Sequence, residues 1–421
     1  MEKLIVKGKK NLLGTISISG SKNASLPVLA ASILSDKKTI LKNIPLVKDI
    51  FTMIELLNFI GLKTELNKKK KILKIFNKNK IITTAPYKLV KTMRAGVLVL
   101  GALLGRYKKA KVSLPGGCAI GGRPVDLHLF ALKKLGAKIK IKNGYIYASA
   151  KNGLKGNTIK FPSISVGATE NAIIASVCAD GKTILRNCAI EPEIQELISF
   201  LKKLGCNIQL DKKRNIIIKK THFFYPATHR IMFDRIELGT YLIASALAGK
   251  KVSLLNINPK IIKSELKILK KMGVKLLVES NRVTVFHSKK LKRINIKTEP
   301  YPGFPTDLQA QIMILMTQAK GLSKIKESIF ENRFMHVPEL KRMGAKIKIK
   351  ENTAKIYGPT KLSGAEVMAT DLRASVCLVL AGLIAEKETT INRIYHLDRG
   401  YENLEMKLKK CKAIIRRTKN V

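Results

Sequence analysis

The chain has 421 residues, which is enough for two or three domains, and 46% of them are hydrophobic, which excludes an intrinsically disordered chain. Lys and Arg outnumber Asp and Glu by 80 to 29, giving a formal charge of +51, and such an excess raises the possibility of a nucleic-acid partner. The basic residues are spread over the whole length, however, and aromatic residues make up only 5% of the chain. We therefore expect weak, salt-sensitive contacts with nucleic acid and no specific binding.

The N-terminus does not predict export or membrane insertion. The sequence MEKLIVKGKKN carries lysines where a signal peptide needs an apolar core. The longest apolar run, residues 95–105, is too short to span a bilayer and predicts a buried helix. We expect a cytoplasmic protein.

The cysteines indicate neither a disulfide framework nor a metal site. No CxxC pair or zinc-like Cys/His cluster occurs, and Cys178 and Cys377 lie in apolar runs that predict core positions. The six cysteines are Cys118, Cys178, Cys188, Cys206, Cys377 and Cys411.

A repeated pattern runs through the chain, in which a helix ends in a glycine turn and two short alternating strands follow. Five copies are centred on Gly61, Gly136, Gly205, Gly273 and Gly344, and a sixth has Lys412 in place of the glycine. Each copy is preceded by a second helix, rich in small residues, and a strand. The spacing of about 70 residues predicts six β-α-β-α-β-β units.

The ends of the chain suggest how the six units close into two domains. Residues 3–8 and 14–19 read as strands that no helix precedes, and the last unit has too few residues for its final strand. We therefore expect the N-terminal strands to complete the C-terminal domain. The predicted domains are residues 22–229, and residues 1–21 with 230–421, each an α/β domain of three units. A cleft between domains is a common place for a ligand site.

Two segments carry residues suited to chemistry. In GSKNASLP (20–27), Lys22 and Asn23 directly precede a helix, where backbone N–H groups favour anions; a capped helix with an incidental lysine remains an alternative. In PGGCAIGGRPVDLH (115–128), four glycines flank Cys118, and Arg123 follows five residues later. A thiol in a glycine-rich loop near positive charge is more typical of a reactive thiolate than of a buried structural cysteine.

These motifs resemble the UDP-N-acetylglucosamine 1-carboxyvinyltransferases, a family of enolpyruvyl transferases that opens peptidoglycan precursor synthesis. The resemblance covers nearly the whole chain and implies two inside-out α/β domains of three repeats each, with the active site in the cleft between them. Besides the two segments above, it rests on KTMRAGVLVLG (91–101), SVGATEN (165–171), DRIELGTYL (234–242), FPTDLQAQ (304–311), ENRFMHVPEL (331–340), ATDLRAS (369–375) and DRGYENL (398–404).

The resemblance also implies roles for individual residues. Lys22 and Asn23 match positions that contact phosphoenolpyruvate, and Lys22 is one of three expected catalytic residues. Cys118 is similar to the family's proton donor, which also forms a covalent adduct with phosphoenolpyruvate. Asp307 matches the residue at the sugar 3-hydroxyl.

The other expected substrate-binding positions include arginines matched to anions, Arg94, Arg123 and Arg399. The remainder are Pro124, Val125, Asp126, Leu127, His128, Ser163, Val166, Ile329, Arg333 and Asp371. At Ser163 some family members carry Lys, so this position departs from the pattern.

The chemistry suits these residue types. The sugar hydroxyl joins C2 of phosphoenolpyruvate while C3 gains a proton, and phosphate then leaves. A base near the hydroxyl and an acid near C3 are needed, which Asp307 and Cys118 can supply. Arginines can bind the anionic substrates, phosphoenolpyruvate and UDP-N-acetylglucosamine, and we expect no cofactor and no metal.

Two other functions are compatible with parts of the sequence. The shikimate-pathway enolpyruvyl transferase shares the fold and the phosphoenolpyruvate chemistry, but the thiol-bearing loop is typical of the sugar-nucleotide enzymes. A non-enzymatic basic protein that binds nucleic acid is the alternative from a different class.

Overall fold

The computed structural model describes residues 2–8, 11–77, 80–116, 125–288 and 290–419. They divide into two compact units, which we call unit 1 (residues 2–19 and 233–419) and unit 2 (residues 20–116 and 125–232). Each unit has a hydrophobic core of its own. Within the described residues, no helix is both long enough and apolar enough to cross a membrane.

Unit 2 contains three four-stranded sheets, and in each the first strand pair is parallel and the others are antiparallel. In sheet order the strands are β14 (Ala227–Arg230), β3 (Thr39–Lys42), β5 (Ile72–Phe76) and β4 (Lys63–Asn67); β6 (Thr84–Ala85), β7 (Lys109–Ser113), β9 (Tyr145–Ser149) and β8 (Lys138–Lys142); and β10 (Thr158–Lys160), β11 (Lys182–Arg186), β13 (Ile216–Lys219) and β12 (Asn207–Leu210). The helices are α1 (Lys22–Ala31), α2 (Lys48–Ile60), α3 (Tyr87–Val90), α4 (Val99–Tyr107), α5 (Asp126–Lys134), α6 (Val166–Ser176) and α7 (Pro192–Lys203).

Unit 1 repeats this plan. Its sheets run β2 (Leu12–Ser17), β15 (Gly249–Leu255), β17 (Arg282–Phe286) and β16 (Lys275–Val278); β18 (Leu291–Lys292), β20 (Ala319–Lys326), β22 (Thr353–Gly358) and β21 (Lys346–Lys350), with β19 (Asn295–Lys297) also beside β20; and β23 (Glu366–Met368), β24 (Glu388–Asn392), β1 (Glu2–Lys7) and β25 (Ile414–Lys419). The helices are α8 (Arg235–Ala248), α9 (Lys263–Lys271), α10 (Gln309–Thr317), α11 (Val337–Arg342), α12 (Leu372–Gly382) and α13 (Leu404–Lys410).

The six predicted repeats are therefore confirmed, one for each sheet. As expected, the N-terminal strands complete the C-terminal domain: β1 lies between β24 and β25 and supplies the strand that the last repeat lacks. The strand β2, which precedes α1 in sequence, pairs with β15 of unit 1, whereas β14, which precedes α8, pairs with β3 of unit 2. The chain passes from unit 1 to unit 2 after Ser19, the first crossing, and returns after Met232, the second crossing. The strand before each crossing therefore pairs within the unit that the chain is leaving.

The turn that identified the repeats has the same backbone conformation in all six. The five glycines have φ between 86° and 114°, a left-handed conformation in which a side chain is unfavourable. Lys412 adopts φ 67° at the matching position of the last repeat. The loss of the glycine therefore did not change the turn.

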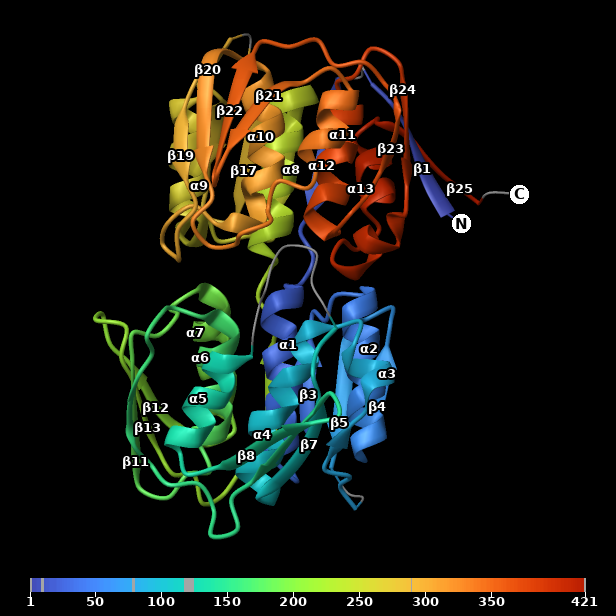
Figure 1. Ribbon diagram of the computed structural model, residues 1–421. Helices are drawn as coiled ribbons and strands as arrows, with labels where there is room; N and C mark the ends of the chain where they lie inside the picture. The colour runs from blue at the N-terminus through green and yellow to red at the C-terminus, as the bar shows by residue number, and fades with distance from the viewer. Residues whose placement is uncertain (1, 9–10, 78–79, 117–124, 289, 420–421) are drawn as a thin grey trace. The chain divides into compact units, whose positions relative to one another are not determined.

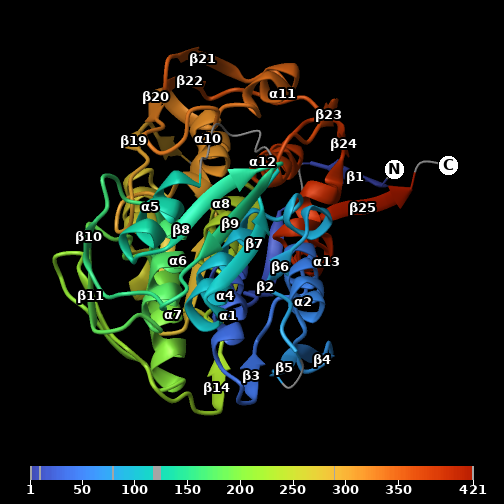
Figure 2. The ribbon, with the colours of Figure 1, turned by 60° about the horizontal axis from the view of Figure 1, so that its bottom comes forward.

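Buried helices lie inside each unit and the sheets lie outside (Figure 1), as the resemblance implies. In unit 2 the sheet containing β7, β8 and β9 comes toward the viewer in Figure 2 and packs on α4. Helices α1, α4 and α6, and their counterparts α8, α10 and α12, are buried on nearly all sides. Polar residues on these six helices are therefore held rigidly within the core.

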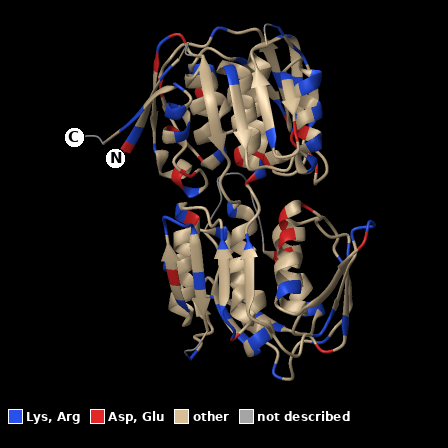
Figure 3. Cartoon of the chain, turned by 180° about the vertical axis from the view of Figure 1, so that it is seen from behind, with Lys and Arg blue, Asp and Glu red and all other residues tan. Residues whose placement is uncertain are grey.

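Lys and Arg residues are distributed along the chain of both units (Figure 3). A nucleic-acid groove would favour a single stripe of basic residues, and on the face shown they do not gather in one. The apolar run at residues 95–105 forms a 3₁₀ helix, Arg94–Leu98, followed by α4, and most of it is buried as expected.

Candidate active site

Asp307 lies in a short 3₁₀ turn, Thr306–Leu308, just before α10. Its Oδ1 accepts a hydrogen bond from Nη2 of Arg333 and its Oδ2 accepts one from Nη2 of Arg373, each at 2.6 Å. Both guanidinium groups are buried, and the carboxylate side chain is 28% exposed. The N-cap position of α10 is Leu308, with no side-chain capping bond, so Asp307 is an ion-paired carboxylate and not a helix cap.

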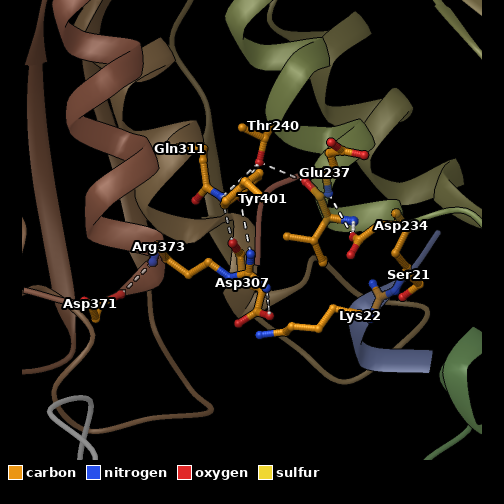
Figure 4. Close-up of polar contacts among 12 residues, drawn as sticks. Ser21, Lys22, Asp234, Glu237, Thr240, Asp307, Gln311, Asp371, Arg373 and Tyr401 are labelled. Atoms are coloured by element: carbon orange, nitrogen blue, oxygen red, sulfur yellow. Dashed lines mark hydrogen bonds and ion pairs between the residues drawn. The ribbon is translucent and has the colours of Figure 1, made fainter. Parts of the chain in front are cut away.

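A network of neutral polar groups supports this carboxylate. The Arg373 Nη1 donates to the Tyr401 hydroxyl at 3.3 Å, and that hydroxyl lies 2.9 Å from Oγ1 of Thr240. The Gln311 amide donates to the Thr240 hydroxyl at 3.2 Å and to the backbone carbonyl of Asp307 at 2.9 Å. The network joins α8, α10 and α12 to Asp307 (Figure 4) and therefore fixes the position of its backbone.

Asp371 caps the N-terminus of α12. Its Oδ1 accepts hydrogen bonds from the backbone N–H groups of Arg373 at 2.7 Å and Ala374 at 3.1 Å. Burial, the largest single influence, lowers the pKa of Arg373, but Asp307, Tyr401 and Asp234 together raise that pKa above its ordinary value. Arg373 is therefore a permanent cation whose helix is anchored by Asp371.

Glu327 anchors two segments near this centre. One of its carboxylate oxygens accepts hydrogen bonds from the hydroxyl of Thr298 and the backbone N–H of Ile329, at 2.9 and 2.8 Å. The other accepts a hydrogen bond from the hydroxyl of Thr306 at 2.9 Å. Because Thr306 precedes Asp307, one buried carboxylate sets both the Asp307 turn and the backbone at Ile329.

Arg399 ends the 3₁₀ helix Ile394–Arg399 and is partly buried. Its neighbour Asp398 receives two hydrogen bonds from the Arg417 guanidinium, at 3.0 and 2.6 Å. Arg417 also donates to Glu405 at 2.9 Å and to Glu2 at 3.0 Å. Strand β25 and the N-terminal strand β1 therefore help to hold the segment that carries Arg399.

The first crossing is anchored within unit 1 at Ser19. The buried Glu237 accepts hydrogen bonds from the Ser19 backbone N–H at 2.7 Å and from the Lys407 ammonium at 2.6 Å. Burial raises the pKa of Glu237, although Lys407 opposes that shift. At the start of the same helix, Asp234 accepts from the N–H groups of Ile236 and Glu237 at 2.8 and 2.9 Å.

In unit 2, Lys22 is the first residue of α1 and its side chain is nearly buried. Its ammonium group lies 3.1 Å from Oδ2 of Asp49, in the first turn of α2. Ser21 caps α1 by accepting a hydrogen bond from the Ala24 N–H at 3.2 Å, and Asn23 beside it is partly exposed. The cap predicted as an alternative exists, but it belongs to Ser21, and Lys22 is a paired, buried cation.

The start of α5 and the start of α6 lie together in unit 2. Val125 is the N-cap residue of α5, Asp126 is exposed, and His128 is buried in its first turn. A Cβ placed on Gly167 would lie 3.1 Å from Cε1 of His128, so Val166 and His128 occupy neighbouring positions. His128 Nδ1 lies 3.0 Å from Nδ2 of Asn171 on α6.

The remaining predicted residues of unit 2 are not in this group. Arg94 begins the 3₁₀ helix before α4 and is partly buried, Leu127 is partly buried, and Ser163 is exposed. Cys118, Arg123 and Pro124 lie outside the described residues.

The five cysteines within the described ranges are free thiols whose surroundings favour the protonated form. Burial raises the thiol pKa of Cys178 and Cys188 to about 12 and that of Cys206 to about 11. Burial also raises the pKa of Cys377 and Cys411. The predicted core position of Cys377 is confirmed, whereas Cys178 is only partly buried.

No group of three or more His, Cys, Asp or Glu side chains suited to a metal ion occurs in the part of the chain that the structure describes. Sequence reasoning missed several residues that position the site: Asp49, Asn171, Tyr401, Glu327 and Gln311. Arg373 was also missed, although it stands in ATDLRAS, a motif singled out for Asp371. A buried charge needs a partner, so an arginine opening an apolar helix was a signal that could have found it.

Comparison with known proteins gives concordant results. Residues 6–408 match the family model described as EPSP synthase (3-phosphoshikimate 1-carboxyvinyltransferase). The chain is 59% identical over 417 residues to a UDP-N-acetylglucosamine 1-carboxyvinyltransferase of Pelagibacter ubique (strain HTCC1062), covering 99% of this chain and 100% of that protein. It is 50% identical over 416 residues to the protein of the same name from Endomicrobium trichonymphae, with 99% of each covered.

Two solved structures resemble the fold. The enolpyruvyl transferase NikO from Streptomyces tendae superposes with a TM-score of 0.90 at 23% identity, covering 99% of both chains. An EPSP synthase from Acinetobacter baumannii gives a TM-score of 0.78 at 16% identity, covering 100% of both. At these identities the likeness establishes the fold alone.

His336, next to this centre in sequence and structure, generates a prediction for stability. Burial lowers the pKa of His336 from 6.5 to about 4; Arg333 also lowers it, whereas Asp371 raises it. Between these values the unfolded chain binds a proton that the folded protein does not, so stability is full above pH 6.5 and falls as the pH drops toward 4. Between pH 8 and pH 5 the free energy of unfolding should fall by about 2 kcal/mol less in His336→Gln than in the wild type. Urea unfolding at both pH values measures this difference.

The exposed His222 provides the matched control, and His222→Gln should keep the wild-type pH dependence. An equal pH dependence in wild type and His336→Gln would show that His336 does not titrate in this way.

Proposed function

The chain belongs to the UDP-N-acetylglucosamine 1-carboxyvinyltransferase family, and on that premise we propose that it transfers the enolpyruvyl group of phosphoenolpyruvate to the 3-hydroxyl of UDP-N-acetylglucosamine. Phosphate is released, and the product enters peptidoglycan precursor synthesis. We also propose that the enzyme is cytoplasmic and uses neither a metal nor an organic cofactor.

The observation that carries the chemical assignment is Asp307 between Arg333 and Arg373. Two guanidinium groups at 2.6 Å favour the ionised carboxylate, which is the form a base needs. A carboxylate has about four acceptor positions, so its two bonds to arginine do not prevent it from accepting a hydrogen bond from a sugar hydroxyl. The supporting network holds the carboxylate in place, which makes proton removal in the transition state effective.

The reaction balances in two steps. In the first, the 3-oxygen of the sugar bonds to C2 of phosphoenolpyruvate as its proton moves to Asp307, and C3 receives a proton from the Cys118 thiol. In the second, C3 returns a proton to the Cys118 thiolate and the C2–O bond to phosphate breaks, which restores the double bond, while the proton held by Asp307 leaves with the phosphate. Lys22, Arg94, Arg123 and Arg399 bind the anionic groups of the two substrates.

The surroundings of the other thiols support Cys118 as the reactive one. The thiol pKa is raised at all five cysteines of the described chain, and a thiol is a nucleophile only as its thiolate. Cys118 is flanked by glycines and followed by Arg123. Among the six it therefore has the sequence environment that best suits reaction with a ligand.

The acceptor remains the point on which the alternatives differ. The matching family model bears the name of the shikimate-pathway enzyme, whereas relatives at 50% and 59% identity bear the name of the sugar-nucleotide enzyme. We therefore favour UDP-N-acetylglucosamine. Phosphate release from phosphoenolpyruvate should require UDP-N-acetylglucosamine and should not occur with shikimate 3-phosphate in its place. Release with shikimate 3-phosphate alone would replace the proposed function by the alternative.

Asp307→Asn and Asp307→Ala should each lower turnover by a factor of ~10² or more, because both remove the base. Asp307→Ala should also lower the unfolding midpoint more than Asp307→Asn, because it leaves Arg333 and Arg373 buried without their partner. Steady-state phosphate release and thermal unfolding measure the two effects. Turnover within a few-fold of wild type in a folded variant would reduce Asp307 to a structural ion pair.

Cys118 should be the thiol that an epoxide phosphonate of the fosfomycin type alkylates, since such a compound mimics phosphoenolpyruvate. UDP-N-acetylglucosamine should accelerate the labelling. Cys118→Ser should abolish both labelling and most turnover, because a hydroxyl is a far weaker acid. Cys118→Asp should resist the epoxide and recover part of the turnover. Peptide mapping that finds the label mainly on another cysteine, or full activity in Cys118→Ser, would disprove the assignment.

A further inference from the structure

A buried amide at the centre of unit 2 contacts the one predicted substrate-binding histidine. Asn171 is fully buried on α6, and its Nδ2 lies 3.0 Å from Nδ1 of His128 on α5. The same Nδ2 donates to the Val97 carbonyl at 3.2 Å, and the Asn171 Oδ1 accepts from the Gly101 N–H at 2.8 Å. The amide therefore connects α4, α5 and α6.

Backbone groups determine which way this amide points. A backbone N–H can only donate and a backbone carbonyl can only accept. The oxygen of Asn171 must therefore face Gly101, and its NH₂ group must face both Val97 and His128. The orientation of the amide follows from these fixed partners and is not interchangeable.

The protonation of His128 follows in turn. One proton of the Asn171 NH₂ group goes to the Val97 carbonyl, and the other points at Nδ1 of His128. A proton on Nδ1 would oppose that amide proton at 3.0 Å, so Nδ1 must accept. A neutral imidazole that accepts at Nδ1 carries its proton on Nε2.

We propose that Asn171 is a positioning residue that holds His128 in its neutral Nε2–H tautomer, so that His128 presents the sugar nucleotide with a hydrogen-bond donor. The substrate part of this inference rests on the proposed function, while the tautomer does not. The ligand atom that meets Nε2 must be an acceptor, and the diphosphate and uracil oxygens of UDP-N-acetylglucosamine are of that kind.

Two glycines make the arrangement possible. A Cβ on Gly101 would lie 2.2 Å from Oδ1 of Asn171, and a Cβ on Gly167 would lie 3.3 Å from Nε2 of His128. The first contact is impossible for any side chain, so Gly101 permits the amide to approach the backbone of α4. The second places the Nε2 edge of the ring against the first turn of α6.

The tautomer can be measured directly on the full-length protein. Two-bond ¹H–¹⁵N correlation spectra of ¹⁵N-histidine-labelled protein at pH 7.5, with His128 assigned by its loss in His128→Gln, should show an unprotonated Nδ1 and a protonated Nε2. A proton on Nδ1 of His128 would overturn the proposal. In Asn171→Ser, whose shorter side chain cannot place a donor at the position of Nδ2, His128 should exchange between its two tautomers.

A control on the same helix separates this effect from a general loss of packing. Ser176 is buried on α6, and its hydroxyl has no hydrogen-bond partner among the described residues. Ser176→Ala should leave the His128 spectrum as it is in wild type. If Ser176→Ala shifts the tautomer as Asn171→Ser does, position 171 has no specific role.

The binding consequence is measured by calorimetry with UDP-N-acetylglucosamine. Asn171→Ser and His128→Leu should each weaken binding by about 10-fold, the worth of one lost hydrogen bond. His128→Gln should stay within about 3-fold of wild type, because its amide can place a donor near the position of Nε2. Equal losses in His128→Gln and His128→Leu would contradict the donor role. If the wild type binds no UDP-N-acetylglucosamine, the proposed function fails, and the spectra still decide the tautomer.

Discussion

The ion pairs between Asp307 and the two arginines are the interaction on which the candidate site of unit 1 depends. They join the turn before α10, the segment at Arg333 and the first turn of α12, three parts of the chain that are far apart in sequence. Removing one member leaves a buried charge without a partner, which costs far more than an exposed pair contributes. The chain satisfies this constraint by surrounding the pairs with the hydroxyl of Thr240 on α8, the amide of Gln311 on α10 and the hydroxyl of Tyr401.

The same constraint takes a different form in unit 2. Lys22 is paired with Asp49, and the Asn171 amide on α6 is satisfied by backbone atoms of α4 and the segment before it and by His128. Not all buried charge there is compensated in this way. Burial, with Glu193 and Glu191 nearby, raises the pKa of Glu170 well above its ordinary value. A buried group held in its neutral form, as we propose for His128, therefore complements the ion pairs of unit 1 as a way to keep polar atoms inside a core.

Both units achieve this because their buried helices come from equivalent places in the repeats. Helix α6 carries Asn171, α10 follows Asp307 directly, and α12 carries Arg373. The outer helices, such as α7 and α9, have one buried side and an exposed side. A repeat thus contributes one helix that can hold functional polar groups precisely and one that covers it from solvent.

The sequence by itself determined the six repeats, because glycine turns and alternating strands are local patterns that survive without tertiary information. It also determined that β1 and β2 belong with the C-terminal domain, since the last repeat visibly lacked a strand. The motifs selected Lys22, Asp307 and Arg333 through their resemblance to a family. Only the tertiary structure decided that β14 pairs with β3 at the edge of the first sheet of unit 2, because a strand of four residues is too short to show a clear alternation of apolar and polar residues. It alone decided the partners of Asp307, Lys22 and His128. Hydrogen bonds and ion pairs between residues tens to hundreds of positions apart depend on how helices pack, and no local pattern encodes that distance.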